Sequence, residues 1–307
     1  MTNDMTKEQV RERLLNNEAL FNLMFVFQQH FDIVPSSDQH IGASIAYQDI
    51  RELRTEFLEA LVDTIVDWIY DAKKFEQLKE TYKLTGKSDG AASAAVIRKA
   101  KSKFRRSNDN LLIQGQLGEL LLFHFIQKVK EAVPLLRKMN ITTSSSHERY
   151  GADAIHYKVE DHKNVIILGE AKAYTLKYKF AKAFEKALES ILETYNNLSD
   201  ELNLYVHEDF LDDELNSVAE AYLTNTLENV RVELVAVIVY NETTAIRLTD
   251  EDGIKEQILS VIERKYRDFD NEKIDVVHNQ ILSRITYIVF PIWELDKFAQ
   301  EFQDKMK

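Results

Sequence analysis

A nearly unbroken run of aliphatic and β-branched residues, VELVAVIVY, occupies positions 232–240. Such a run is too apolar for a strand with one face in water, and it is typical of a strand that is buried on both faces of a sheet. Burying both faces requires helices packed on each side. Only 8 Gly and 3 Pro occur among the 307 residues, so few helices should be interrupted. The sequence therefore predicts an α/β (α+β) fold with a central sheet flanked by helices.

The order of the elements indicates how the sheet is connected. Four further segments have the composition of strands, at about 139–143, 152–159, 164–173 and 283–290. Helices are predicted at about 110–131, 178–198, 253–269 and 293–306. Consecutive strands favour an antiparallel meander, whereas strands reached through helices favour crossover connections. We therefore expect a mixed sheet.

The first part of the chain has a different pattern. Residues 1–90 are expected to form a helical N-terminal region, because 18–27 is apolar on most faces and 46–82 carries an amphipathic helical stripe. The small and polar residues at 85–95 favour a linker. Residues 91–307 then form the main region, with an acidic helical insertion at about 199–229.

Composition excludes several kinds of chemistry. The chain has no Cys, which rules out disulfides, thiolate-bound zinc, iron–sulfur clusters and a Cys nucleophile. It has no signal peptide and no apolar run long enough to cross a membrane, so we expect a cytoplasmic protein without membrane contact. The 39 basic and 51 acidic residues give a net charge of −12, which disfavours a non-specific DNA clamp. It does not exclude a nucleic-acid enzyme, because local charge matters more than the total.

The segment 165–174, VIILGEAKAY, ends a buried strand with two charged residues. Residues two apart on a strand share a face, so Glu170 and Lys172 point the same way. Burying these charges costs free energy unless each finds a partner. The pattern acid–x–Lys occurs four times in the chain, but only at Glu170 does it end an apolar strand that follows another acid-bearing strand.

That other acid is Asp153, on the strand just before. A short turn around residues 160–163 would make a hairpin, with its centre near Asp161 and His162. Asp153 and Glu170 lie almost symmetrically about this centre. The register therefore predicts that Asp153, Glu170 and Lys172 meet at one edge of the sheet.

A third carboxylate lies in the helix predicted at 110–131. By three- and four-residue spacing, Glu119 shares a face with Leu122, Phe123 and Ile126, and a carboxylate in so apolar a surface should be paired or bound to metal. Gly115 and Gly118 permit close approach of a strand or ligand, although each weakens the helix by about 1 kcal/mol relative to Ala.

Three carboxylates without a thiol favour a hard cation, Mg²⁺ or Mn²⁺. Such a metal would polarise a phosphodiester and lower the pKa of a bound water. Lys172 could position that water or stabilise charge in the transition state, and it could act as a base only if its pKa were depressed. The residues therefore favour metal-dependent phosphodiester hydrolysis.

This layout resembles the PD-(D/E)xK nuclease superfamily. The resemblance implies that Glu119, Asp153, Glu170 and Lys172 are catalytic, and that Glu119, Asp153, Glu170 and the backbone carbonyl of Ala171 bind metal. Ala152 stands where the name-giving Pro would be, a mild departure because that Pro is not a metal ligand.

More narrowly, the runs GELLLF at 118–123, RYGAD at 149–153 and LGEAK at 168–172 resemble the HamA family, the nuclease subunits of Hachiman anti-phage defence systems. The resemblance covers about residues 100–290. It implies a bacterial defence role, cleavage of DNA, and a partner helicase subunit, HamB, that holds the nuclease in check.

Two basic segments are candidates for contact with nucleic acid. Six cations fall within nine positions without an intervening acid: Arg98, Lys99, Lys101, Lys103, Arg105 and Arg106. Lys177 and Lys179 lie at a predicted helix start, where backbone amides and cations suit phosphate. A run of like charge is also common on an ordinary solvated face, so both interpretations stay open.

A second interpretation of the whole chain competes with the nuclease. The charged cluster at Glu170 and Lys172 could be a structural ion-pair network in a non-catalytic regulatory or nucleic-acid-binding subunit. Removal of one charge would then leave a buried partner unpaired and cost stability. In a metal site, crowded carboxylates repel one another, so removing one should leave the metal-free protein equally or more stable.

Overall fold

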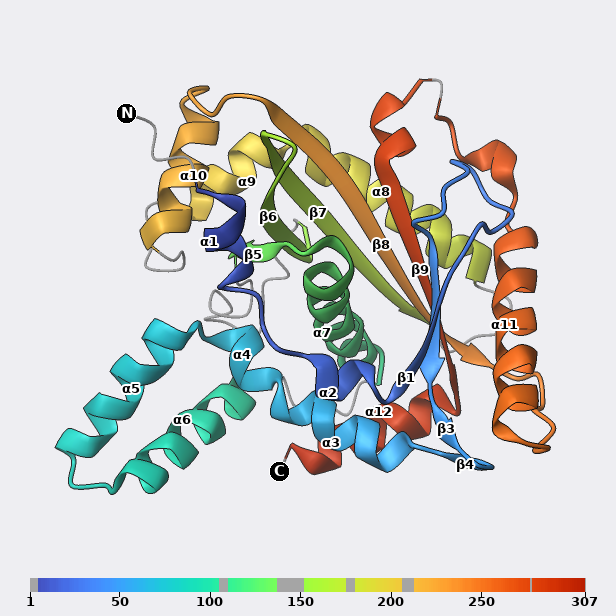
Figure 1. Ribbon diagram of the computed structural model, residues 1–307, viewed down its shortest axis with the longest axis horizontal. Coiled ribbons are helices and arrows are strands. Elements are labelled where there is room, and N and C mark those ends of the chain that lie inside the picture. Colours follow the sequence, from blue (N-terminus) through green and yellow to red (C-terminus); the bar gives the residue numbers. More distant parts are fainter. Residues whose placement is uncertain are drawn as a thin grey trace.

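A seven-stranded mixed sheet forms the centre of the molecule in this computed structural model (Figure 1). The structure describes residues 5–104, 110–136, 152–174, 180–205, 213–276 and 278–306. The sheet has the order β1-β2-β9-β8-β7-β6-β5. Its strands are β1 (Met24–Gln28), β2 (Ile41–Ile45), β5 (Val133–Leu136), β6 (Ala154–Glu160), β7 (Lys163–Tyr174), β8 (Val230–Glu242) and β9 (Ile285–Trp293). A small hairpin of β3 (Tyr47–Gln48) and β4 (Arg51–Glu52) lies apart from it.

Strand β8 is the central strand that the apolar run at 232–240 predicts. It pairs in parallel with both β7 and β9, and every residue from 232 to 240 is buried. Its side chains alternate between two separate apolar clusters: Leu234 and Ala236 belong to one, Val235 and Val237 to the other. The prediction of a strand buried on both faces is confirmed.

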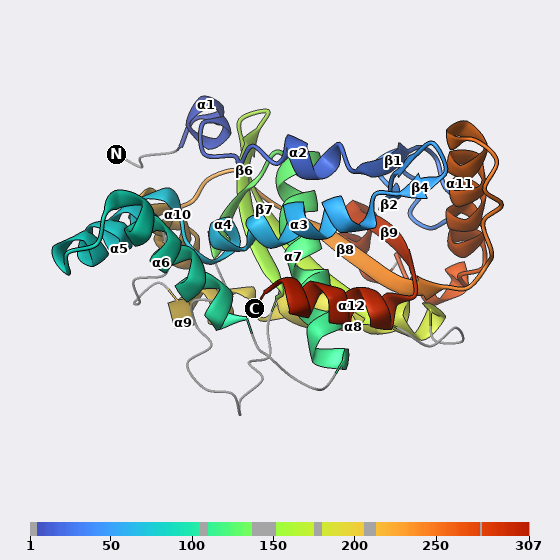
Figure 2. The ribbon, with the colours of Figure 1, turned by 90° about the horizontal axis from the view of Figure 1, so that it is seen from below.

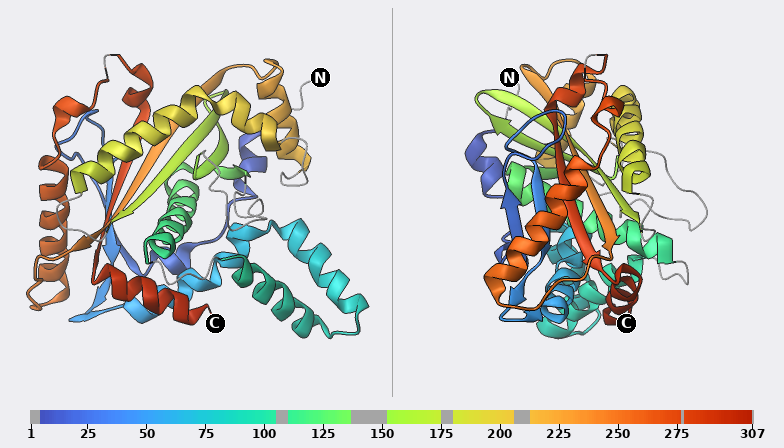
Figure 3. Two further views of the ribbon diagram at one scale, coloured as in Figure 1. Left: turned by 180° about the vertical axis from the view of Figure 1, so that it is seen from behind. Right: turned by 90° about the vertical axis from the view of Figure 1, so that its right-hand side faces the viewer.

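Helices cover both faces of the sheet. On the face in front in Figure 1 lies α7 (Asn110–Lys130), with α3 (Arg54–Asp63) and α12 (Leu295–Lys305) packed in the same apolar cluster. The opposite face is covered by α8 (Phe180–Asn196), which crosses the strands in the left view of Figure 3, and by α11 (Glu251–Arg267) at the side. The predicted mixed sheet flanked by helices is confirmed.

Several further helices are short or lie at the periphery of the sheet. They are α1 (Lys7–Arg11), α2 (Glu18–Phe21), α4 (Ile65–Ile69), α9 (Leu198–Tyr205), α10 (Asp213–Leu223) and the 3₁₀ turns η3 (Asn271–Lys273) and η4 (Gln280–Arg284). Helices α9 and α10 fall within the predicted helical insertion. The strand expected at 139–143 lies outside the described residues, and the strand that pairs with β6 on that side is β5.

The N-terminal region contains strands as well as helices. The prediction of one buried helix over 18–27 is wrong beyond Phe21, because Met24–Gln28 is the strand β1. In β1, Phe25 and Phe27 are buried while Val26 is 41% exposed, which is the two-residue period of a strand. An apolar run this short does not distinguish strand from buried helix. Strand β1 pairs with β2, and β2 joins the main sheet by pairing in parallel with β9.

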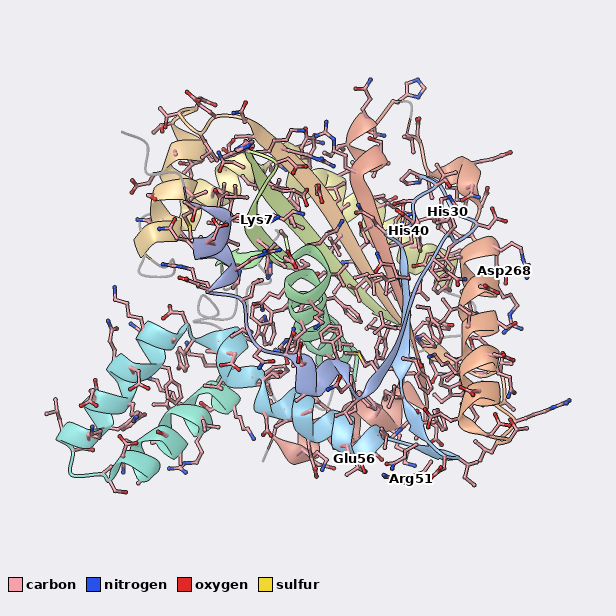
Figure 4. The ribbon with its side chains drawn as sticks, viewed as in Figure 1. Lys7, His30, His40, Arg51, Glu56 and Asp268 are labelled. Atoms are coloured by element: carbon pink, nitrogen blue, oxygen red, sulfur yellow. The ribbon has the colours of Figure 1, made fainter. Side chains whose placement is uncertain are left out.

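A buried histidine fastens this edge of the sheet. Nε2 of His40 lies 2.6 Å from the carbonyl oxygen of Pro35, which can only accept, so this nitrogen carries the proton. Nδ1 then accepts the backbone N–H of Tyr287 at 3.2 Å. The ring thereby joins the loop between β1 and β2, where Figure 4 marks it, to strand β9.

Two helices form an arm that projects from the rest of the molecule (Figures 1 and 2). They are α5 (Ala72–Leu84) and α6 (Asp89–Lys103), which lie antiparallel. The side chain of Asp71 caps α5 by accepting from the backbone N–H of Lys74 at 2.6 Å, and that of Ser88 caps α6. The predicted linker at 85–95 is therefore wrong beyond residue 88. Its alanines belong to α6, where Ala92 and Ala95 are buried.

Candidate active site

The β6–β7 hairpin positions the candidate acidic residues. Asp161 and His162 form its two-residue turn with φ of 49° and 60°, the backbone that a tight hairpin turn requires at both positions. From this turn the register runs from Glu160 opposite Lys163 to Ala154 opposite Gly169. The predicted hairpin and its centre are therefore confirmed, and Asp153 comes next, at the level of Glu170.

Asp153 is fastened to β7 through both its backbone and its side chain. Its N–H donates to the carbonyl oxygen of Gly169 at 3.1 Å. Its Oδ2 accepts a hydrogen bond of 2.9 Å from the N–H of Ala171. The Asp153 side chain therefore extends the hydrogen bonding to β7 by one residue beyond the start of β6.

Glu170 and Lys172 share the face of β7 that is turned toward α8. Their face also carries Ile166 and Leu168, which lie in the same apolar cluster as α8. The Glu170 side chain is 3% exposed and that of Lys172 is 28% exposed. Nζ of Lys172 donates to Oε1 of Glu170 at 2.5 Å, whereas Oε2 of Glu170 is buried without a hydrogen-bond partner among the described residues. The Ser190 hydroxyl of α8 is near enough to lower the pKa of this carboxylate, but it makes no hydrogen bond to Oε2.

The pKa values reflect this crowding. The pKa of Glu170 is raised to about 8, mainly by burial and then by the negative charge of Asp153, while Lys172 and the Ser190 hydroxyl oppose both effects only in part. Burial on its own would lower the pKa of Lys172, but the charges of Glu170 and Asp153 outweigh burial and raise it. Lys172 is therefore a cation in this arrangement, and the depressed pKa that a base requires is not found.

The carbonyl group of Ala171 lies on the same edge of β7 as its N–H, because both groups of one strand residue point to the same side. That N–H points toward Asp153. The carbonyl oxygen of Ala171 is thus directed to the edge of β7 that also meets the Asp153 carboxylate.

Glu119 reaches this region from the other side of the sheet. Helix α7 packs against β7 on the face opposite α8, where a Cβ added at Gly118 would lie 3.3 Å from Cβ of Ala171. The prediction that Gly118 permits close approach of a strand is confirmed. Glu119 itself is half-buried, and its neighbours Leu122 and Phe123 are buried. Within the described ranges, no three acidic or histidine side chains lie close enough to hold one metal ion.

The structure thus brings Asp153, Glu170 and Lys172 together and leaves Glu119 outside their cluster. Of the predicted nucleic-acid contacts, Arg98, Lys99, Lys101 and Lys103 lie on α6 in the projecting arm. Arg105, Arg106, Lys177 and Lys179 lie outside the described residues. The sequence interpretation missed Lys74, which the antiparallel arm brings near Lys99 and Lys103. Recognising residues 72–103 as one helical hairpin would have indicated it.

A mixed sheet flanked by helices, with an acid at the start of one strand and acid–x–Lys on its hairpin partner, is the arrangement of PD-(D/E)xK-like α+β folds. The HamA family model matches residues 20–306. The chain therefore belongs to the HamA family of Hachiman defence-system proteins. No curated protein matches it. None of the helices in the described ranges has the length and hydrophobicity needed to cross a bilayer.

Proposed function

We propose that this chain is a metal-dependent nuclease that hydrolyses phosphodiester bonds in DNA. One observation carries the proposal: Asp153 and Glu170 meet beside Lys172 at the end of a hairpin, with one oxygen of Glu170 buried and lacking a donor among the described residues. Buried carboxylates are stable only when something positive pairs with them. Lys172 contacts Glu170 directly, yet the pKa of Glu170 stays raised, so the arrangement fits a further cation.

The donor set fits a hard divalent ion. Carboxylate and carbonyl oxygens are the ligands that Mg²⁺ and Mn²⁺ prefer, and neither thiolate nor histidine stands among these residues. Asp153, Glu170 and the carbonyl of Ala171 would hold the ion, with Glu119 as the helix acid that the family resemblance adds. When bound, the ion would polarise the phosphodiester and lower the pKa of a water.

The chain's own contribution is positional and electrostatic. The hydrogen bond from Ala171 N–H orients the Asp153 carboxylate before any substrate arrives. The Lys172 ammonium is partly exposed and cationic, so it can contact a phosphate oxygen on which negative charge increases during cleavage. Of the three roles considered for Lys172, these features favour charge stabilisation over base catalysis.

Family membership supports the biological setting. Within a Hachiman defence system, we propose that the chain is the effector subunit, acts in the cytoplasm and works with the helicase subunit HamB. Restraint by such a partner would suit a nuclease that must spare the DNA of its own cell. The Mg²⁺ or Mn²⁺ requirement, the DNA target and the HamB partner can each be tested by a separate experiment.

A cleavage assay tests the enzyme assignment. The purified chain is incubated with plasmid, linear DNA and RNA, with and without Mg²⁺ or Mn²⁺. We expect metal-dependent cleavage of DNA, and we expect Lys172→Ala to lower the rate by about 10²- to 10³-fold, the usual cost of losing one group that stabilises transition-state charge. Lys163→Ala is the matched control, because Lys163 is an exposed lysine at the other end of the same strand. Equal cleavage by both variants would show that Lys172 has no part in the reaction.

The competing candidate is a non-catalytic subunit in which Glu170 and Lys172 are a structural ion pair. The direct contact of 2.5 Å between them favours it. It predicts no cleavage by the wild-type chain under any metal condition, and it predicts a loss of stability when Glu170 is neutralised.

A further inference from the structure

The arm of α5 and α6 has the opposite charge from the rest of the chain. Residues 72–103 contain nine Lys or Arg and three Asp or Glu, a net charge of +6 in a chain whose net charge is −12. The arm also projects away from the sheet and its covering helices (Figures 1 and 2). A strongly positive segment is therefore presented apart from the acidic remainder of the molecule.

The three acids of the arm are all paired: Glu80 and Asp89 lie toward its tip, and Glu76 lies in the inner half of α5. Lys79 contacts Asp89 at 3.1 Å and Glu76 at 3.5 Å. Lys83 contacts Glu80 at 2.7 Å and Asp89 at 3.6 Å. These pairs join α5 to α6 and offset most of the positive charge in the outer half of the arm. The excess positive charge thus belongs to its base.

Five cations gather at that base, and we name them the arm-base cluster: Lys74, Arg98, Lys99, Lys101 and Lys103. The antiparallel pairing of the helices places Lys74 of α5 across from Lys99 of α6. Burial lowers the pKa of Lys103, and the positive charges of Lys99 and Lys74 lower it further. The Lys103 ammonium lies 5.0 Å from the centre of the Tyr70 ring. Like charges are therefore held close together here.

The exposed members of the cluster have no acidic partner in the described part of the chain. Arg98 and Lys99 are exposed, and neither forms an ion pair with a described residue, nor does Lys101 or Lys74. Holding such charges side by side is unfavourable unless an external anion compensates them. The cluster is thus suited to a ligand that carries several negative charges.

We propose that the arm-base cluster binds the phosphate backbone of double-stranded DNA, at a site separate from the hairpin that carries Asp153 and Glu170. The inference rests on the proposed nuclease function for its choice of DNA. It assigns Lys74 to nucleic-acid binding, and it makes the arm a tether that holds the substrate independently of cleavage. Contacts of this kind are sequence-independent and weaken steeply with salt.

An acidic protein partner is the other polyanion to consider, and the surface of the arm favours DNA. The core of a protein interface is apolar or aromatic and depleted of charge. Of the large hydrophobic residues on the described arm, only Leu84 and Ile97 are exposed, one at the tip and one midway along α6. They form no continuous apolar patch beside the arm-base cluster. A surface of closely spaced cations without an apolar centre matches a phosphate backbone better.

The test measures binding rather than cleavage. The full-length chain is titrated against a short, fluorescently labelled DNA duplex in EDTA, so that no metal-dependent cleavage occurs, at salt concentrations from about 50 to 200 mM. The variant Arg98→Gln/Lys99→Gln is compared with Lys255→Gln/Arg267→Gln. Each removes one Lys and one Arg from exposed helix positions, but the second pair lies on α11, at the opposite side of the molecule.

We expect the arm variant to bind about tenfold or more weakly at 0.1 M salt, and its log–log salt slope to fall by about two, close to one unit per lost phosphate contact. The α11 variant should match the wild type. Equal affinities and slopes for the two variants would overturn the proposal, as would an absence of DNA binding by the wild-type chain. Cleavage is scored separately with Lys172→Ala. If the wild-type chain binds DNA through the arm but does not cleave it, only the nuclease assignment is wrong. If the wild-type chain cleaves DNA and the arm variant binds DNA as tightly as the wild type, only the tether proposal is wrong.

Discussion

The Asp153 carboxylate accepts a hydrogen bond of 2.9 Å from the backbone N–H of Ala171, on the neighbouring strand of its hairpin. This side-chain hydrogen bond replaces the backbone hydrogen bond that the residue before Asp153 would make if β6 extended further. The bond holds a carboxylate beside Glu170, whose pKa is raised mainly by burial and further by the charge of Asp153. The charged form of Glu170 is therefore disfavoured in the isolated chain, and the cation that we propose would stabilise it.

Stability measurements distinguish this arrangement from a structural ion pair. In metal-free buffer we expect Glu170→Gln to melt at the wild-type temperature or above it, because burial and Asp153 disfavour a charged side chain at this position and the amide carries no charge. Glu233 on β8 is the matched control: it is equally buried, but it has Arg231 at 3.1 Å and Lys130 at 3.4 Å. Glu233→Gln should lose about 3 kcal/mol, because it leaves the buried Lys130 without its carboxylate. A comparable loss for Glu170→Gln, measured by thermal or urea unfolding, would support the ion-pair interpretation.

Metal titration tests the proposed ligands one by one. Calorimetry with Mn²⁺ should show that Asp153→Asn weakens binding by about 10- to 100-fold, the size seen even for groups that only support a metal ligand. Glu119→Gln should also weaken it if the helix acid reaches the ion from the α7 side. Wild-type affinity in Glu119→Gln, together with loss in Asp153→Asn, would confine the metal to the hairpin and remove Glu119 from the set of ligands.

The two glycines of α7 should respond oppositely to larger side chains. A Cβ at Gly118 would meet Cβ of Ala171 at 3.3 Å, so Gly118→Leu should push α7 away from β7 and cost about 1–3 kcal/mol. A Cβ at Gly115 would meet nothing within 4 Å, so Gly115→Ala should stabilise the protein by up to about 1 kcal/mol through helix propensity. Urea unfolding checks both. A loss of stability in Gly115→Ala would contradict the open surroundings of that residue.

His124 predicts a dependence of stability on pH. Thr64 donates its hydroxyl proton to the carbonyl of Leu61, so the histidine Nε2–H donates to Thr64 Oγ1, at 2.7 Å. Burial lowers the pKa of His124 from 6.5 to about 3. The unfolded chain therefore binds the proton more readily than the folded one. The contribution of the neutral His124 ring to the free energy of unfolding is complete above pH 6.5. This contribution is lost as the pH falls toward 3, by about 1.4 kcal/mol per pH unit.

Replacement of this histidine should flatten the profile. In His124→Gln the amide can still donate to Thr64, but nothing titrates. Urea unfolding from pH 7 to 5 should therefore show a smaller loss of stability than in wild type. His162→Gln, in the exposed hairpin turn, is expected to keep the wild-type profile. If His124→Gln also kept it, another group would be responsible.

Local patterns predicted much of the fold and most of the hairpin site. Strand β8 was recognisable because every residue in its core is apolar or β-branched except Glu233. The pairing of Asp153 with Glu170 was recognisable because a two-residue turn fixes the register of all residues that follow it. Both predictions needed only residues close together in the sequence.

Features that depend on distant contacts were not predictable in the same way. Strand β1 was interpreted as helix because its partner is β2, which joins the main sheet through β9, near the other end of the chain. The position of Glu119 relative to the hairpin was not predictable because α7 is buried around most of its circumference, so a stripe of apolar residues does not identify one inward face. The small residues of α6 were interpreted as a linker. They are small because they pack closely against α5, and the sequence of α6 does not show that contact.

The parallel pairing of Ile41 with Ile288 has a consequence for the synthesis of this protein. Strand β2 leaves the ribosome roughly 250 residues before the strand that completes its side of the sheet, and at about 5–20 residues per second that interval is about 12–50 s. During this time the β1–β2 hairpin presents an open edge on which other chains can pair. The β6–β7 hairpin, whose strands are adjacent in the sequence, can form well before then. We infer that the β6–β7 hairpin forms early during translation and that the sheet is completed only after β9 has emerged.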